Sequence, residues 1–261
     1  MRQLRGLVLL SVVACVAALA CTAQAQTGVQ FRTVAVGALT YPYEVFVPPT
    51  WTKQQRWPII LFLHGVGHSG KYSDPPEPLL APRFTSYQKQ SAAIVVFPRC
   101  RTGAWWSDAD METMALKALE QTVREFNGDP ERLYLTGLSM GGYGTWFLAS
   151  RHPGKFAAIA PVCGGIRTPP TIAIPPVSTA PDSYGDVARK IGKTPVWIFH
   201  GSADETISVE ESRRMLKALK AAGGNVRYTE YSGVGHNSWD RAYAEPEFFP
   251  WLLSHRFSKK Q

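Results

Sequence analysis

Short, uninterrupted apolar runs constrain the fold of this chain more than any other feature of its sequence. The clearest is Pro58–Leu63, which contains no polar residue and is therefore typical of a strand buried on both faces. Further runs of this kind are Ala92–Phe97, Leu133–Leu135, Ala157–Ala160 and Val196–Phe199. Val226–Tyr231 is more polar, so we expect it as the last strand, near the edge of the sheet.

Helical patterns separate these runs. Asp110–Phe126 has apolar residues at helical spacing and is followed by an Asn-Gly pair that stops a helix. Ser208–Ala222 is predicted to begin with a capping box, in which Ser208 and Glu211 satisfy backbone N–H groups reciprocally. Two further helices are expected over Gly142–Ser150 and Pro246–His255. Strands alternating with helices predict an α/β fold, with a mostly parallel, twisted sheet and helices on both faces.

The segments outside this alternation complete the predicted domain. Val29–Gly37 and Tyr41–Val47 alternate in polarity and are expected to form an antiparallel pair, which brings the sheet to about eight strands. The chain length of 261 residues suits a single domain, predicted over residues 26–261. Ile166–Pro181 contains five prolines, which disfavour helix and interior strand. It is expected to be a loop bordering an open cleft or a plain surface connection, and it is too short for a large lid.

The first residues are expected to lie outside this domain. A short basic start precedes the almost wholly apolar stretch Leu7–Ala20, and Ala23-Gln24-Ala25 has the small-x-small pattern of a cleavage site. These features predict a signal peptide over residues 1–25 and a secreted or periplasmic protein. The alternatives are an uncleaved anchor, for which the apolar run is short, and a lipoprotein modified at Cys21, whose preceding residues only loosely fit the required pattern.

Charge and cysteine content follow from that cleavage. Removal of Arg2 and Arg5 would lower the formal net charge from +8 to +6. A basic surface of this size serves solubility or favours acidic polymers, and the sequence contains no Lys/Arg block dense enough for nucleic acid.

Cleavage would leave Cys100 and Cys163, which follow strands that are not neighbours in the predicted sheet. We therefore expect free thiols rather than a disulfide.

Gly137-Leu138-Ser139-Met140-Gly141 matches the pattern G-x-S-x-G. The pattern alone is common by chance, but here a short apolar strand precedes it and helix-compatible sequence follows. A tight strand-to-helix turn lifts a serine oxygen above the sheet and requires small neighbours, which Gly137, Gly141 and Gly142 provide. Ser139 is therefore the predicted nucleophile.

A serine hydroxyl needs a base that is itself oriented by an acid. In hydrolases with this strand–turn–helix pattern, the acid and then the histidine follow the serine along the chain, each after a strand. Asp204 follows the strand predicted over Val196–Phe199, and His236 follows the strand predicted over Val226–Tyr231. The sequence thus predicts a Ser139, Asp204 and His236 triad.

Other acids and histidines compete for these two roles. Glu205 and Asp182 are the rival acids, and Asp204 is preferred because a short acid directly after the strand best reaches the ring nitrogen. His64 and His200 each end a strand before a glycine, where we expect them to bond to loop backbone. The remaining histidines are His68, His152 and His255, and none has the position of His236.

The oxyanion of acyl transfer needs two aimed backbone donors. The first expected donor is the N–H of Met140, the residue after the nucleophile. The second is expected from His64–Gly67, where glycines let the backbone approach the substrate, and we assign it to the Val66 N–H. An ordinary tight turn is the alternative for that segment.

Tryptophans flank the predicted loops. Trp105 and Trp106 follow a predicted strand, and Trp239 lies just beyond the predicted base. Each is a candidate wall of the substrate pocket, with core packing as the alternative, and for Trp106 we favour the pocket. No cofactor or metal site is predicted, since neither Cys100 nor Cys163 lies near a second ligand at metal spacing.

Several segments carry a resemblance to a known family. They are Leu61–Gly65, Thr136–Trp146, Pro161–Gly165 and Gly233–Trp239. From about Tyr41 to its end, the chain resembles the bacterial predicted peptidase or phospholipase/carboxylesterase-like α/β-hydrolases. These are related to dienelactone hydrolases, feruloyl-type esterases and the catalytic domain of prolyl oligopeptidases. The resemblance implies the α/β-hydrolase fold and the same triad, but it specifies the substrate poorly.

Three functions compete on this basis. The first is a secreted serine hydrolase that cleaves short-chain, aryl or feruloyl esters, free or linked to carbohydrate, through an acyl-enzyme. The second is a peptidase of the prolyl oligopeptidase type, for which the chain has no room for a propeller. The third is a binding protein on a retired scaffold, disfavoured because every catalytic position is filled. Neither the acyl group, the alcohol nor the oligomeric state follows from the sequence.

Overall fold

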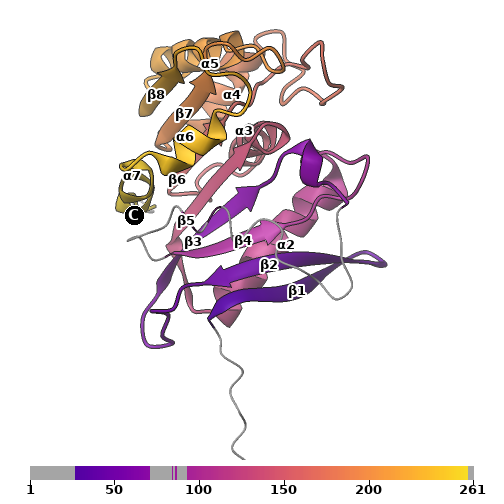
Figure 1. Ribbon diagram of the computed structural model, residues 1–261, viewed down its shortest axis with the longest axis vertical. Helices are drawn as coiled ribbons and strands as arrows, with labels where there is room; N and C mark the ends of the chain where they lie inside the picture. The colour runs from indigo at the N-terminus through magenta and orange to yellow at the C-terminus, as the bar shows by residue number, and fades with distance from the viewer. Residues whose placement is uncertain (1–26, 71–83, 85, 87–92, 258–261) are drawn as a thin grey trace, which may run out of the picture.

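A computed structural model describes residues 27–70, 84, 86 and 93–257 of the chain. Within them, eight strands form one open sheet in the order β1-β2-β4-β3-β5-β6-β7-β8 (Figure 1). The strands are β1 (Gly28–Val36), β2 (Leu39–Val47), β3 (Trp57–Leu63), β4 (Ile94–Pro98), β5 (Gly128–Leu138), β6 (Ala158–Val162), β7 (Val196–Gly201) and β8 (Val226–Tyr231). β2 pairs antiparallel with both β1 and β4, and every other neighbouring pair is parallel. The predicted mostly parallel α/β sheet of about eight strands is confirmed.

Strand β3 illustrates why the apolar runs form the centre of the sheet. All seven of its residues are buried. Because side chains alternate between the faces of a strand, Ile59 and Leu61 join one apolar cluster while Ile60 and Phe62 join another. A polar residue anywhere in this strand would therefore enter a core.

Helices cover both faces, as predicted. They are α2 (Ala109–Glu125), α3 (Met140–Arg151), α4 (Ser183–Ile191), α5 (Glu210–Ala221), α6 (Trp239–Ala244) and α7 (Phe248–Ser254), with a short 3-10 turn η1 (Val66–His68). α2 to α5 bury side chains such as Met114, Trp146 and Met215 in the cluster that contains Ile59. α6 and α7 bury Tyr243 and Phe248 in the cluster that contains Ile60, and Figure 1 shows them beside β6.

The expected capping box at the start of α5 is wrong. Glu211 does not fold back on the helix, because other groups occupy its carboxylate. Its Oε2 accepts hydrogen bonds from the N–H of Ile166 at 2.7 Å and of Arg167 at 3.1 Å, and its Oε1 accepts one from the Tyr184 hydroxyl at 2.6 Å. Glu211 has the spacing of a helix-capping residue, but it anchors a loop that lies far away in the sequence.

That loop, residues 166–181, has no regular helix or strand, as its prolines predicted. It is nevertheless pinned at several points. The Val177 N–H donates to the Ile166 carbonyl at 2.8 Å, the Thr171 hydroxyl donates to the Thr206 carbonyl at 2.5 Å, and Ile174 is buried. The contact with Thr206 places it against the turn that follows β7.

Both remaining cysteines are free and buried, in line with the expectation from strand order. Cys100 follows β4 and Cys163 follows β6, and β3 and β5 lie between those strands. At about 4.8 Å per strand the two backbones are too far apart for a disulfide. The predicted signal peptide and the rival site at Cys21 lie outside the described residues. Among the helices that are described, none is long and apolar enough to cross a membrane.

Candidate active site

Ser139 occupies a strained turn between β5 and α3. Its φ of 54° and ψ of −118° lie in a region that L-residues rarely adopt. The turn is held because the Ser139 N–H donates to the Val162 carbonyl at 3.0 Å. A Cβ at Gly141 would overlap the Leu63 carbonyl oxygen, and one at Gly142 would lie 2.6 Å from the Val162 oxygen. The glycines are therefore required by close backbone approach, as the sequence indicated.

The three predicted triad residues lie together. The Ser139 Oγ is 2.9 Å from His236 Nε2, and His236 Nδ1 is 2.8 Å from Asp204 Oδ2. A carboxylate can only accept a hydrogen bond, so Nδ1 carries a proton and Nε2 is left to accept the proton of the serine hydroxyl. This arrangement can raise the nucleophilicity of Ser139.

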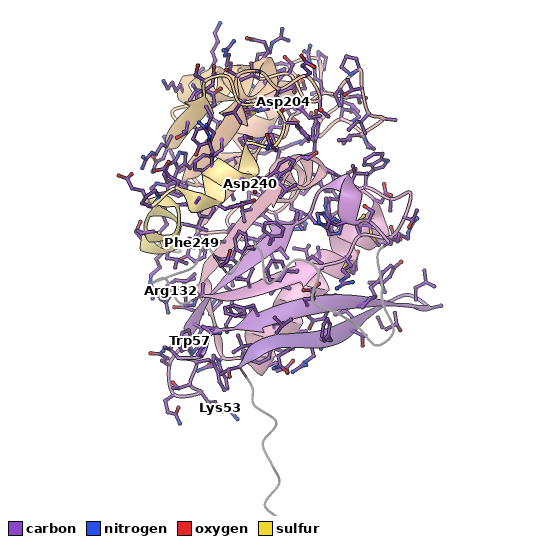
Figure 2. The ribbon with its side chains drawn as sticks, viewed as in Figure 1. Lys53, Trp57, Arg132, Asp204, Asp240 and Phe249 are labelled. Carbon is purple, nitrogen blue, oxygen red and sulfur yellow. The ribbon has the colours of Figure 1, made fainter. Side chains whose placement is uncertain are left out.

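Two loops bring the acid and the imidazole together. Asp204 follows β7 and His236 follows β8, and these two strands are neighbours. The Ala203 N–H donates to the Val234 carbonyl at 2.9 Å, which joins the loops. A Cβ at Gly201 would overlap that same carbonyl oxygen, so only glycine permits this approach. Figure 2 labels Asp204 at one end of the sheet and Asp240 on the neighbouring helix α6.

The environment of Asp204 favours its ionised form. Burial alone would raise its pKa, but hydrogen bonds from His200, from His236 and from the Ile207 backbone together hold the pKa of this carboxyl well below its ordinary value. Its Oδ1 accepts from the N–H groups of Thr206 and Ile207, both at 2.9 Å. An anionic, fully bonded carboxylate is suited to hold His236 in the required tautomer.

The rival acids lie elsewhere. Asp182 is the N-cap of α4, where its side chain accepts a hydrogen bond from the Gly185 N–H, and it pairs with Arg189 at 3.3 Å. Glu205 is exposed, on the same loop as Asp204. Of these three acids, Asp204 is the one in contact with His236.

The segment after β3 passes close to the serine. A Cβ at Gly65 would lie 3.5 Å from the Ser139 Cβ, so the adjoining Val66 is next to the predicted oxyanion position. Val66 begins the turn η1 and Met140 begins α3. The first N–H groups of a helix have no partner within it, so both residues can direct a backbone donor at a substrate oxygen. The Val66 side chain is 46% exposed.

The side chain of His64 holds the segment after β3 in place. The ring is fully buried, its Nδ1 donates to the Gly65 carbonyl at 2.8 Å, and its Nε2 accepts from the Cys100 N–H at 3.0 Å. Burial lowers the pKa of His64 to about 3. A structural imidazole bonded to loop backbone was the expected role, and the geometry agrees with it.

The tryptophans differ in position. Trp106, which we expected at the pocket, is 1% exposed and lines the narrow crevice that Trp105 also lines. It packs against the His64 ring and donates its indole N–H to the His64 carbonyl at 3.0 Å. Trp105 is partly exposed and lines a narrow apolar crevice together with Met140, Phe147, Ile174, Pro175 and Val177, among others. Trp239 is partly exposed and meets the His236 ring edge to face, with the ring centroids 5.5 Å apart.

Cys163 corrects another expectation. We expected neither cysteine near a second metal ligand, yet its Sγ and ligand atoms of Asp204 and His236 all lie within 4.8 Å of one another. Burial strongly raises the pKa of this thiol, so the uncharged form is favoured. Asp204 and His236 already bond to each other, so we regard the uncharged Cys163 side chain as an apolar packing contact of the triad. Its contact with the triad spans three loops, which no sequence spacing indicates.

Comparisons with known proteins match the chain to one family model and to several curated proteins. A family model for the dienelactone hydrolase family matches residues 26–245. Poly(3-hydroxyalkanoate) depolymerase C of Paucimonas lemoignei is 24% identical over 203 residues, which are 68% of this chain and 45% of the depolymerase. Carboxylesterase SOBER1 of Arabidopsis thaliana is 26% identical over 205 residues, which are 68% of this chain and 82% of that protein.

Solved structures show the same fold. A thermostable esterase superposes with a TM-score of 0.73 at 29% identity, covering 87% of this chain and 63% of that one. The chain spans less than half the length of the first curated relatives that it matches. The comparisons therefore show a family and a fold, and the names of these relatives describe the activities of those proteins.

Proposed function

The chain belongs to the dienelactone hydrolase family, and from this premise we propose that it is a serine hydrolase that cleaves carboxylic esters through an acyl-enzyme. The observation that carries the proposal is the continuous contact from Ser139 through His236 to Asp204, at 2.9 and 2.8 Å. The proposed substrates are short-chain, aryl or feruloyl esters, free or linked to carbohydrate, and the partly exposed Trp105 and Trp239 are the proposed contacts for them.

In the first half of the reaction, Ser139 Oγ attacks the ester carbonyl carbon while its proton passes to His236 Nε2. Asp204 stabilises the imidazolium through Nδ1. The negative charge on the carbonyl oxygen is met by the N–H groups of Met140 and Val66. Collapse of the tetrahedral species expels the alcohol, which takes the proton from Nε2, and leaves the acyl group on Ser139.

In the second half, water replaces the alcohol. His236 Nε2 removes a proton from the water as the hydroxyl oxygen attacks the acyl carbon, and the same two N–H groups stabilise the second oxyanion. Breakdown returns the proton to the Ser139 oxygen and releases the carboxylic acid. Every proton transfer uses the one ring nitrogen that faces the serine.

Export of the enzyme is a further part of the proposal. It rests on the apolar stretch and small-x-small pattern of residues 1–25, and one relative of 26% identity is named a secreted protein. Cleavage there would release a mature enzyme that begins near Gln26. Trp105 and Trp239 are proposed to contact substrate, since both are partly exposed near the serine or the imidazole.

A panel of substrates tests this proposal. The mature protein would be assayed on p-nitrophenyl acetate and butyrate, methyl ferulate, acetylated xylan and short peptide anilides. We expect ester cleavage that Ser139→Ala lowers by about 10⁴-fold or more. Ser254→Ala is the matched control, because this exposed serine bonds only to a nearby carbonyl at the end of α7. Cleavage of the anilides with no turnover of any ester would overturn the proposal in favour of a peptidase.

A further inference from the structure

A second buried histidine adjoins the triad acid and takes no part in the reaction described above. His200 is the penultimate residue of β7 and is fully buried. Its Nε2 lies 3.0 Å from the carbonyl oxygen of Ile207, and its Nδ1 lies 2.7 Å from the Ser212 Oγ on α5. Both ring nitrogens therefore have partners, and those partners come from two different elements.

These partners define the tautomer. A carbonyl oxygen can only accept, so Nε2 carries a proton, and Nδ1 is then free to accept the hydroxyl proton of Ser212. The same Nε2 is 3.2 Å from Asp204 Oδ2. Its N–H is thus directed mainly at Ile207 and secondarily at the carboxylate, on the oxygen that also faces His236.

Both carboxylate oxygens of Asp204 consequently have close partners. One of its oxygens accepts two backbone N–H groups at 2.9 Å, and the other lies between two imidazole nitrogens, at 2.8 Å from His236 and 3.2 Å from His200. The turn of residues 204–207 is closed at its far end by the bond from His200 to Ile207. Rotation of the carboxylate would break several of these contacts together.

We propose that His200 is a positioning residue that sets the orientation of Asp204, and through it the orientation of His236. This rests on the proposed function, since it concerns the same triad. His200 is shielded from substrate by its burial, so its removal affects the step in which His236 moves a proton and leaves substrate binding unchanged. The sequence signal is the four-residue spacing from His200 to Asp204, because the turn between them brings the two side chains together.

Two polar substitutions separate this role from a general loss of packing. In His200→Gln the side-chain amide reaches the position of Nε2 and can still donate toward Ile207 and Asp204. In His200→Asn the shorter amide reaches only the position of Nδ1, toward Ser212. Ser212→Ala removes the Ser212 contact alone and serves as the matched control for disturbing the buried network.

The test uses the mature protein and two measurements. The first is the low-field proton resonance of the His236 Nδ1–H, assigned by its loss in His236→Gln. The second is the split between kcat and KM on the best ester of the panel. We expect His200→Gln and Ser212→Ala to keep the resonance and most of kcat. His200→Asn should shift or broaden the resonance and lower kcat about 10- to 100-fold, with KM within about twofold of the wild type.

Equal resonances and equal kcat in His200→Gln and His200→Asn would overturn the positioning role. So would a drop in kcat in all three variants that follows their loss of melting temperature. The resonance is observed without substrate, so it decides the role of His200 even if the wild type cleaves none of the esters. That last result would overturn the proposed function instead.

Discussion

The histidines His64, His200 and His236 show how ring partners divide one residue type into different roles. His64 has both nitrogens bonded to backbone groups and a pKa lowered by burial to about 3. His200 bonds to a carbonyl and to a hydroxyl. His236 lies between a carboxylate and the Ser139 hydroxyl and is partly exposed. Only the last arrangement leaves a nitrogen that can exchange a proton with substrate.

His64 should make the protein sensitive to mild acid. Its pKa is lower in the folded state than the ordinary 6.5, so below pH 6.5 the unfolded chain binds the proton more readily. The contribution of His64 to stability is therefore fully present above pH 6.5, and it falls by about 1.4 kcal/mol per pH unit as the pH drops toward 4. Urea unfolding at pH 7 and pH 4.5 measures this loss.

His64→Asn isolates the contribution of this ring. The variant should be less stable than the wild type at pH 7, because the Cys100 N–H loses its acceptor. Its stability should nevertheless change less between pH 7 and pH 4.5. An equal slope in both proteins would show that other groups cause the acid sensitivity.

At the scale of elements, the turn from β5 through Ser139 to α3 depends on backbone proximity. A Cβ at Gly141 would overlap the Leu63 carbonyl, whereas one at Gly67 would meet nothing within 4 Å. We expect Gly141→Ala to destabilise the protein by about 3 kcal/mol, with Gly67→Ala changing its stability by much less. Thermal unfolding of the two variants checks this, and similar melting temperatures would contradict it.

The indole of Trp106 bonds to the segment that carries the proposed oxyanion donor Val66. In Trp106→Phe the His64 carbonyl loses its donor while most of the packing volume is kept. We expect kcat to fall about tenfold with little change in KM, because the segment bearing Val66 is less firmly held. Trp105→Phe is the comparison, since Trp105 is partly exposed and should alter KM instead. A change confined to KM in Trp106→Phe would contradict this role.

The sequence predicted elements well where one physical signal dominated. The buried runs became strands because burial on two faces excludes polar residues. The more polar Val226–Tyr231 became β8, the last strand of the sheet. α4 and α6 were not predicted, since their nine and six residues give too short a periodic signal.

Long-range contacts account for the remaining differences. Glu211 has the spacing of a helix cap, but two loop N–H groups and a tyrosine hydroxyl occupy it. The contact between Ser139, His236 and Asp204 could be predicted, because the order of these residues along the chain follows from the parallel sheet. The contacts of Cys163 and Trp106 with the site depend on how loops fold over it, and a single sequence carries no pattern for that.

At the scale of the whole molecule, each of the two apolar clusters contains one cysteine thiol that reagents should not reach. Burial raises the pKa of Cys100 to about 12 and that of Cys163 beyond its usual range. Ellman's reagent should therefore not react with the native protein. After denaturation, a protein cleaved near Ala25 should show two thiols, because the other two cysteines are in residues 1–25. Four thiols, or a disulfide in the mass spectrum, would contradict cleavage or the free pair respectively.

The central claim is that Ser139 is the nucleophile, activated by His236 and Asp204. Labelling with a fluorophosphonate probe followed by peptide mass spectrometry tests it most directly, because the probe reacts only with an activated serine. We predict one adduct, on the peptide that contains Ser139, and its absence in both Ser139→Ala and His236→Ala. An unlabelled wild-type protein, or an adduct on any other serine, would contradict the account.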